Sequence, residues 1–500
     1  MKKITLFSFL LLIGLPIFAQ ETEITAPTDS IAVVADSTII PETVKTVIYG
    51  TTTPERYGAA LELRSTTDGI TNRETVLATA RIDSKGGFRF EFEPEFSGAV
   101  FIPLDAANGF LFVEKEKTYQ ITLPPVQKRT RAEQFDPYFR PASMILSVVE
   151  PDENDITVQI SAFEDAFDQQ YMRSLVSRDR DTINLVIDEL RAASGVSKSR
   201  FVEDYKKFRY ALLASIPASG RLEQALHFMY QADIAQAYAS PAFWEIFHLL
   251  FNDFFSAFPG EEVQADIERA IRQNDMAAMD AILNIYFEMP AALRQLVIIK
   301  SLTDLYNRTP KDEKKDDDKR AYLLSIFEEY AAGGELTEKN REIAQAVIAR
   351  LKKTNVGEKA FNFRLPDERG KMHSLSDFKG KYVYLHFANA FINQSKQDLP
   401  VLSRFAKKFK DFEVINIFVY NTAQDLQLEL APDLKRETLN LHWNNNAALL
   451  DEYEVRNVPT FFLIDPQGNF LYSPAPSPAE GFEEKYSKMM LEKEVNRLGR

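Results

Sequence analysis

The chain has 500 residues, 45% of them apolar, a formal charge of −14 and no cysteine. Without cysteine it forms no disulfide, so its stability has to come from packing, for which its length is ample. The negative charge repels phosphate backbones and anionic lipid headgroups, so nucleic acid and membrane surfaces are poor candidate partners.

The N-terminus has the features of a secretory signal over residues 1–19. Lys2 and Lys3 form a basic start, residues 5–17 are mainly apolar, and residues 17–19 (Ile-Phe-Ala) are a plausible cleavage site. The apolar run is short for a membrane span of about 20 residues, so we favour cleavage over a retained signal anchor. We therefore predict a periplasmic or secreted chain with no membrane span and a mature charge of −16. Without a cysteine it is not a lipoprotein.

Residues 20–43 are rich in Thr, Ser, Ala and acids and show no sustained periodicity, which predicts a flexible linker. Short alternating runs follow, such as residues 59–64 and 88–93; in the second run the three phenylalanines share one face. Pro124 and Pro125 then end the pattern. We predict an antiparallel β-sandwich domain over residues 44–127.

Residues 128–354 have helical periodicity and predict a central α-helical domain, more like a bundle than a regular solenoid. Residues 243–258 are apolar around most of a helix, which is typical of a buried core helix. The alternative for this stretch is a groove for an apolar peptide, or an interface. The almost wholly charged run Lys311–Arg320 predicts an exposed loop between helices.

From residue 355 onward several ordered motifs resemble one family of proteins. They are Val356–Leu365, Ser374–Lys381, the strand–turn–helix pattern of Lys381–Pro400, and Asn457-Val-Pro-Thr-Phe-Phe-Leu-Ile-Asp-Pro-Gln-Gly468. Together they resemble the TlpA-like and ResA-like exported thiol-disulfide oxidoreductases. The resemblance implies an α/β thioredoxin-like fold over residues 355–500. It also suggests that the front of the chain belongs with the small β-domains often joined to such thioredoxins.

The positions that carry the family's redox chemistry have changed in this chain. The two cysteines of Cys-x-x-Cys fall on Ile392 and Ser395. Isoleucine cannot attack sulfur, and a serine hydroxyl acts only when a base activates it. The buried polar position behind the cysteines falls on His386, for which we favour a hydrogen-bonded core histidine over a proton shuttle. We therefore predict no catalytic residue and no autonomous thiol–disulfide exchange.

A recognition surface survives the loss of the thiols. The family's proline beside the active site falls on Pro459, and the resemblance implies a cis bond to Val458. In this fold the backbone before that proline pairs with extended peptides, which needs no cysteine. We therefore predict a peptide-binding site formed by Phe391, Ile392, Val458 and Pro459.

No cofactor or metal site is predicted. No two histidines have the spacing of metal ligands on one helix, and an acidic run such as Asp316–Asp318 lacks the spacing of a calcium loop. The five histidines are His227, His248, His373, His386 and His442.

The preferred hypothesis is a redox-inactive, thioredoxin-like module of the cell envelope that binds a peptide or protein partner. One alternative is an oxidoreductase relative that acts only with a partner's cysteines, or a catalyst of unrelated chemistry. Another is a purely structural envelope protein whose last domain is a folded brace.

Overall fold

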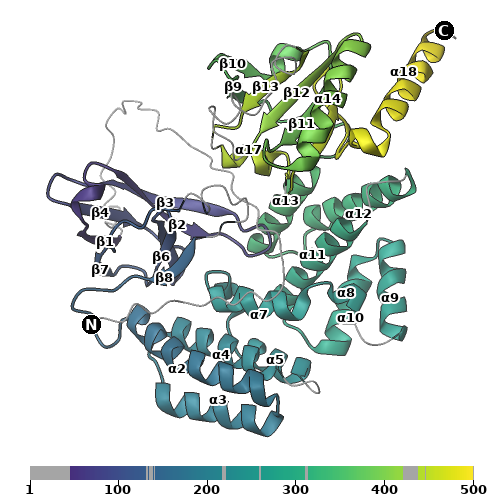
Figure 1. Cartoon of the computed structure of the whole chain (residues 1–500). Helices are drawn as coiled ribbons and strands as arrows, with labels where there is room; N and C mark the ends of the chain where they lie inside the picture. Colours follow the sequence, from purple (N-terminus) through teal and green to yellow (C-terminus); the bar gives the residue numbers. More distant parts are fainter. Residues whose placement is uncertain are drawn as a thin grey trace, which may run out of the picture.

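The computed structural model describes residues 45–130, 133, 139, 141–216, 221–257, 261–309, 314–419, 437–444, 446–455 and 457–498. The predicted signal peptide (1–19) and linker (20–43) lie outside the described residues. Figure 1 shows three regions in chain order, in which the helical region lies between the N-terminal sheets and the C-terminal α/β region.

Two sheets form the N-terminal region. One has three strands in the order β4-β1-β7, and the other has five in the order β3-β2-β5-β6-β8. The elements are β1 (Thr46–Thr51), η1 (Pro54–Arg56), β2 (Ala60–Thr66), β3 (Glu74–Arg81), β4 (Gly87–Phe92), β5 (Gly98–Pro103), β6 (Ala107–Val113), β7 (Thr118–Thr122) and β8 (Ala142–Ile145).

The two sheets share one hydrophobic core. Phe88, Phe90 and Phe92 are buried on one face of β4, as the alternation predicts, and pack with Leu61 and Leu63 of the other sheet. The expectation of a purely antiparallel region is wrong, because β1 pairs with β7, and β6 with β8, in parallel. A parallel pair needs a crossover that the alternation of side chains does not encode.

The described parts of residues 156–352 form a central region of helices. The apolar stretch predicted as one core helix is two helices, because the chain breaks at Asn252 and Asp253, where Asp253 has a φ of 54°. Phe243, Phe247 and Phe251 are fully buried, as expected of a core helix. The helices are α2 (Ile156–Ser177), α3 (Arg180–Ser194), α4 (Arg200–Ala214), α5 (Arg221–Tyr230), α6 (Ile234–Ala237), α7 (Pro241–Phe251), α8 (Phe254–Ala257), α9 (Glu261–Arg272), α10 (Met276–Phe287), α11 (Ala291–Arg308), α12 (Lys314–Ala332) and α13 (Glu338–Lys352).

The charged run predicted as a loop is mostly helical. Helix α12 begins at Lys314, and the buried guanidinium of Arg320 donates to the carbonyls of Tyr306 and Thr309. Charge alone therefore misplaced this segment. The first part of that loop prediction, residues 311–313, lies outside the described residues.

A loop of the β-region inserts into the helical core. A Cβ on Gly69 would lie 2.3 Å from the Trp244 ring, so only glycine fits there without displacing that ring. Ile70 belongs to the helical core, and His248 Nε2 bonds to the carbonyl of Gly69 at 2.8 Å. The two regions are therefore packed as one body (Figure 1).

Within the described ranges, no single helix has both the length and the apolar composition of a membrane span. Helices α10 and α11 meet that criterion only as a pair, with a bend of 117° between them.

The C-terminal region is a five-stranded sheet in the order β13-β12-β11-β14-β15, with helices on its faces. Strands β11, β12 and β13 are parallel, whereas β14 and β15 are antiparallel to their neighbours. The elements are β9 (Arg364–Pro366), β10 (Met372–Ser374), η2 (Leu375–Phe378), β11 (Tyr382–Ala388), α14 (Asn393–Lys408), β12 (Phe412–Phe418), β13 (Leu439–His442), α17 (Ala447–Glu452), β14 (Thr460–Ile464), β15 (Phe470–Tyr472), η3 (Pro478–Glu480) and α18 (Phe482–Leu498).

The two main cores of this region contain only residues from Ala360 onward. Polar contacts hold the region to the end of α13. Lys353 Nζ donates to Glu452 at 2.8 Å, and Thr354 Oγ1 donates to Glu454 at 2.9 Å.

Candidate functional site

The turn between β11 and α14 holds two exposed apolar side chains. Phe391 is 56% exposed and Ile392 is 36% exposed. Asn389 shapes this turn: its Oδ1 accepts from the N–H of Phe391 at 2.9 Å, its carbonyl accepts from the N–H of Ile392, and its Nδ2 donates to the carbonyl of Val419. These bonds fix the backbone of the turn that carries the two exposed apolar side chains.

Ser395 lies one turn further, inside the start of α14, and is fully buried. Its hydroxyl accepts a bond from the N–H of Asn389 at 3.3 Å. Neither a histidine nor a carboxylate bonds to this hydroxyl within the described ranges, so the structure places no base that would activate it. Ile392 is the residue before α14 and gives that helix no side-chain cap.

A second polar group is buried in the same helix. Asp398 accepts from Gln394 Nε2 at 3.3 Å, and its other oxygen is buried without a partner among the described residues. Burial raises the pKa of the Asp398 carboxyl. Asp398 stands three residues after Ser395, so both side chains lie on one face of the helix.

Behind the turn, His386 is the centre of a buried polar network. Its Nδ1–H donates to Asn416 Oδ1 at 2.9 Å, and Asn416 Nδ2 donates to Asn440 Oδ1 at 2.8 Å. The imidazole stacks on Phe461 with ring centroids 4.4 Å apart. Burial lowers the pKa of His386 to about 4, so the ring is neutral at pH 7. This arrangement matches the predicted core histidine.

The Val458–Pro459 peptide bond is cis, as the resemblance implies. Antiparallel pairing of β11 with β14 sets Phe387 opposite Thr460, so continuing that register places Val458 beside Asn389, at the edge where the exposed turn begins. The side chain of Val458 packs against the core. No hydrogen bond to the backbone of Val458 occurs among the described residues.

The topology thus brings the four predicted binding residues to one edge of the sheet. Among the described residues, the site has the unbonded backbone of Val458, an apolar rim (Phe391 and Ile392) and a buried polar floor (His386, Asn416 and Asp398), and no base activates its one hydroxyl, that of Ser395. No group of three or more potential metal ligands occurs in the described part of the chain. Sequence reasoning missed Asn389 and Asp398. An asparagine directly after a buried strand, and an aspartate three residues after Ser395, are signals that could have found them.

Comparisons with known proteins agree with this geometry. Residues 356–473 match the model of the AhpC/TSA family. Thiol-disulfide oxidoreductase ResA of Bacillus subtilis is 32% identical over 128 residues, which is 25% of this chain and 70% of that protein. ResA of Bacillus cereus is 28% identical over 138 residues, covering 25% and 73% of the two chains.

Solved structures similar to the same region include the thioredoxin domain of a thiol-disulfide oxidoreductase from Bacteroides vulgatus. It is 23% identical, with a TM-score of 0.25, and the match covers 27% of this chain and 96% of that chain.

The thioredoxin-like region is therefore identified by its ordered motifs, its sheet and its relatives, and it differs from the redox pattern at both cysteine positions. Through this C-terminal region the chain belongs to the ResA-like family of thiol-disulfide oxidoreductases, as a member without cysteine.

Proposed function

We propose that the thioredoxin-like domain is a redox-inactive module that binds an extended peptide segment of a partner protein. The observation that carries the proposal is the backbone of Val458, to which no described residue bonds, next to an exposed apolar rim. A peptide that pairs with this backbone gains main-chain hydrogen bonds, and its side chains can cover Phe391 and Ile392. Pro459 shapes this part of the site.

The absence of a thiol limits what the domain does by itself. Disulfide exchange proceeds through a mixed disulfide, which this chain cannot form at Ile392 or Ser395. Binding needs none of that chemistry. Burying one apolar side chain on the rim contributes about 1.5–3 kcal/mol, so contacts of this size add to the main-chain bonds.

The proposed location is the cell envelope, in the periplasm or outside the cell. The basic and apolar pattern of residues 1–19 supports export, and a cysteine-free chain is suited to an oxidising compartment because it has no thiol to oxidise. The proposed partner is a protein or peptide of that compartment.

The test is capture of partner proteins from an envelope extract by the mature chain, with the Ile392→Asp variant beside it. A charge on the rim should lower the yield of the specific partner at least tenfold. Leu491→Asp is the control, because Leu491 is an exposed apolar residue of the same domain, on α18, with 63% of its surface exposed against 36% for Ile392. Equal capture by wild type and Ile392→Asp would contradict the proposal and move the binding site to another domain.

A further inference from the structure

A second place where the backbone is open lies on the N-terminal region, at the outer edge of strand β7. Strands β1 and β7 are parallel, with Val47 opposite Thr118. The N–H of Val47 donates to the carbonyl of Lys117 at 2.9 Å. In a parallel pair, a bonded residue such as Val47 makes its hydrogen bonds to the two neighbours of the residue opposite it. Thr118 is the residue opposite Val47, so its own N–H and carbonyl point away from β1.

The outer edge of β7 is covered only along its second half. The N–H of Val149 donates to the carbonyl of Gln120 at 2.7 Å, and Val148 forms an antiparallel bridge with Ile121. Glu150 then has a φ of 48°, in the left-handed region, and the chain turns away from the strand. No described residue bonds to the outer side of Thr118.

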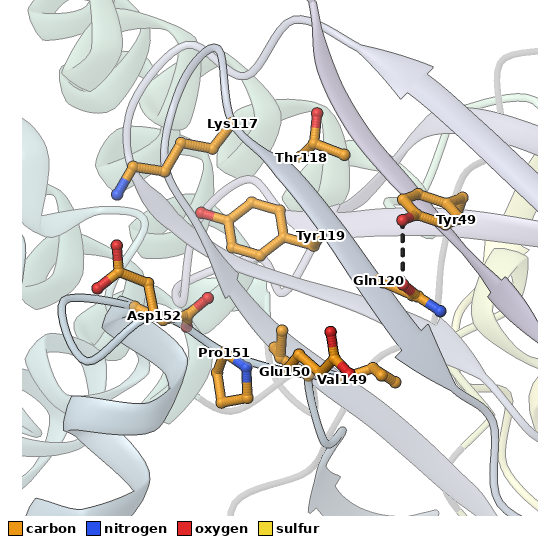
Figure 2. Close-up of a pocket in the computed structure, with 11 residues that line it drawn as sticks. Tyr49, Lys117, Thr118, Tyr119, Gln120, Val149, Glu150, Pro151 and Asp152 are labelled. Carbon is orange, nitrogen blue, oxygen red and sulfur yellow. Dashed lines mark hydrogen bonds between the residues drawn. The ribbon is translucent and has the colours of Figure 1, made fainter.

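A hollow of about 400 Å³ lies where the covering segment leaves β7. Figure 2 shows its walls, formed by the start of β7 on one side and the segment before α2 on the other. Tyr119 lies at its base and is only 2% exposed. The hydroxyl of Tyr119 accepts from the N–H of Glu114 at 2.8 Å, and its proton has no acceptor among the described residues.

The charge around the hollow is negative. Glu150, Asp152 and Asp155 line it. Among the described lining residues the one cation is Lys117, which is paired with Glu114, and Lys198 outside the lining also acts on Asp152. Hydrogen bonds from Asn154 hold the pKa of Asp152 below its usual range, so this exposed carboxylate is charged at pH 7. A basic side chain therefore complements the hollow, whereas an acidic one is repelled.

We propose that this open edge binds an extended peptide carrying a basic side chain. The peptide continues the antiparallel addition that Val148 and Val149 begin, pairs with the free peptide groups of Thr118, and places its lysine or arginine beside Asp152. The site is separate from the thioredoxin-like rim. The chain's own residues 20–43 are a poor occupant, because they contain five acidic residues and no basic one.

The test uses two pools of nine-residue peptides passed over the immobilised mature chain. Threonine alternates with a random choice of valine, isoleucine, tyrosine or phenylalanine, and the central residue is arginine in one pool and glutamate in the other. We expect at least tenfold greater retention of the arginine pool. The best-retained peptide should also slow amide hydrogen exchange at Thr118 by at least tenfold.

Two variants reverse a negative charge within the hollow, and a control variant makes the same charge reversal just outside it. Asp152→Lys and Glu150→Lys should each lower retention at least tenfold. Glu153→Lys makes the same change next to the hollow, at a residue that does not line it, and should retain the peptides. Ile392→Asp should also retain them, which separates this proposal from the function proposed for the thioredoxin-like domain.

Several results would overturn the proposal. They are equal retention of the two pools, no retention of either, an equal loss in Glu153→Lys, and a loss in Ile392→Asp. A further result would also overturn it: the amide of Thr118 is protected from hydrogen exchange without any peptide, and deletion of residues 20–40 removes that protection. In that case the chain's own N-terminal segment would cover the edge.

Discussion

The floor and the rim of the thioredoxin-like site reverse the usual distribution of side chains. On the floor, polar residues such as His386, Asn416 and Asp398 are buried. On the rim, Phe391 and Ile392 are apolar and exposed. Hydrogen bonds among His386, Asn416 and Asn440 tie the floor to stability, whereas His386 Nε2 and Asp398 Oδ2 are buried without a partner among the described residues. An exposed apolar rim adds little to folding, which is compatible with the role in binding that we propose for it.

The largest expected effect concerns the floor and depends on pH. Burial lowers the pKa of His386 from its ordinary value of 6.5 to about 4, so only the unfolded chain takes up this proton between those values. The stability contributed by a neutral His386 is present above pH 6.5 and is lost as pH falls toward 4, by on the order of 3 kcal/mol.

The measurement is amide exchange of strand β11 in wild type and His386→Gln from pH 7.5 to pH 4. The difference in opening free energy should shrink steadily as pH falls. Burial also lowers the pKa of His248 to about 4, but both chains contain this residue, so its contribution to the pH dependence cancels in the difference. A difference that does not change with pH would contradict the neutral, buried imidazole.

The next effect comes from removing the amide that links the floor. Asn416 accepts from His386 and donates to Thr438 and Asn440. We expect Asn416→Ala to lower the free energy of unfolding of this domain by about 2 kcal/mol, because buried polar groups lose their partners. Denaturant unfolding of the variant and of wild type measures this loss of free energy. A loss under about 0.5 kcal/mol would show that the network does not hold the floor.

Separating the thioredoxin-like domain from the helical region should lower the free energy of unfolding by a smaller amount. A fragment of residues 355–500 keeps both main cores, and it loses the ion pair of Lys353 with Glu452 and the bond of Thr354 to Glu454. Partly exposed pairs of this kind contribute about 1 kcal/mol or less. The fragment should therefore be folded and monodisperse, as seen in its amide NMR spectrum. A spectrum of a disordered chain would show that the helical region completes its core.

The smallest expected effect on stability belongs to the rim. Ile392→Asp should change the free energy of unfolding by under about 0.5 kcal/mol, because the side chain is at the surface of a turn. Thermal unfolding of this variant beside Asn416→Ala compares rim and floor directly. If the two losses are equal, the rim is part of the packing and its exposure says nothing about binding.

Much of this architecture could be predicted because its signals are local. The alternation of residues 88–93 gave the correct buried face of β4, and the motifs around Ile392 and Pro459 placed the C-terminal fold. Parallel pairing of β1 with β7 could not be read from the sequence, since it depends on strands more than sixty residues apart. Asn389 and Asp398 do carry local sequence signals, but only the structure shows that Asn389 Nδ2 donates to the carbonyl of Val419 and that Asp398 Oδ2 is buried.

The central claim is that residues 392 and 395 occupy the family's redox positions in a domain that has lost their chemistry. The most direct measurement compares dithiothreitol-coupled insulin reduction and thiol content in wild type and the Ile392→Cys/Ser395→Cys double variant. Wild type should match the buffer rate, and the double variant should close into an internal disulfide, because the two positions lie one turn apart at the start of α14. Turnover by wild type, or a folded double variant that never oxidises internally, would contradict the account.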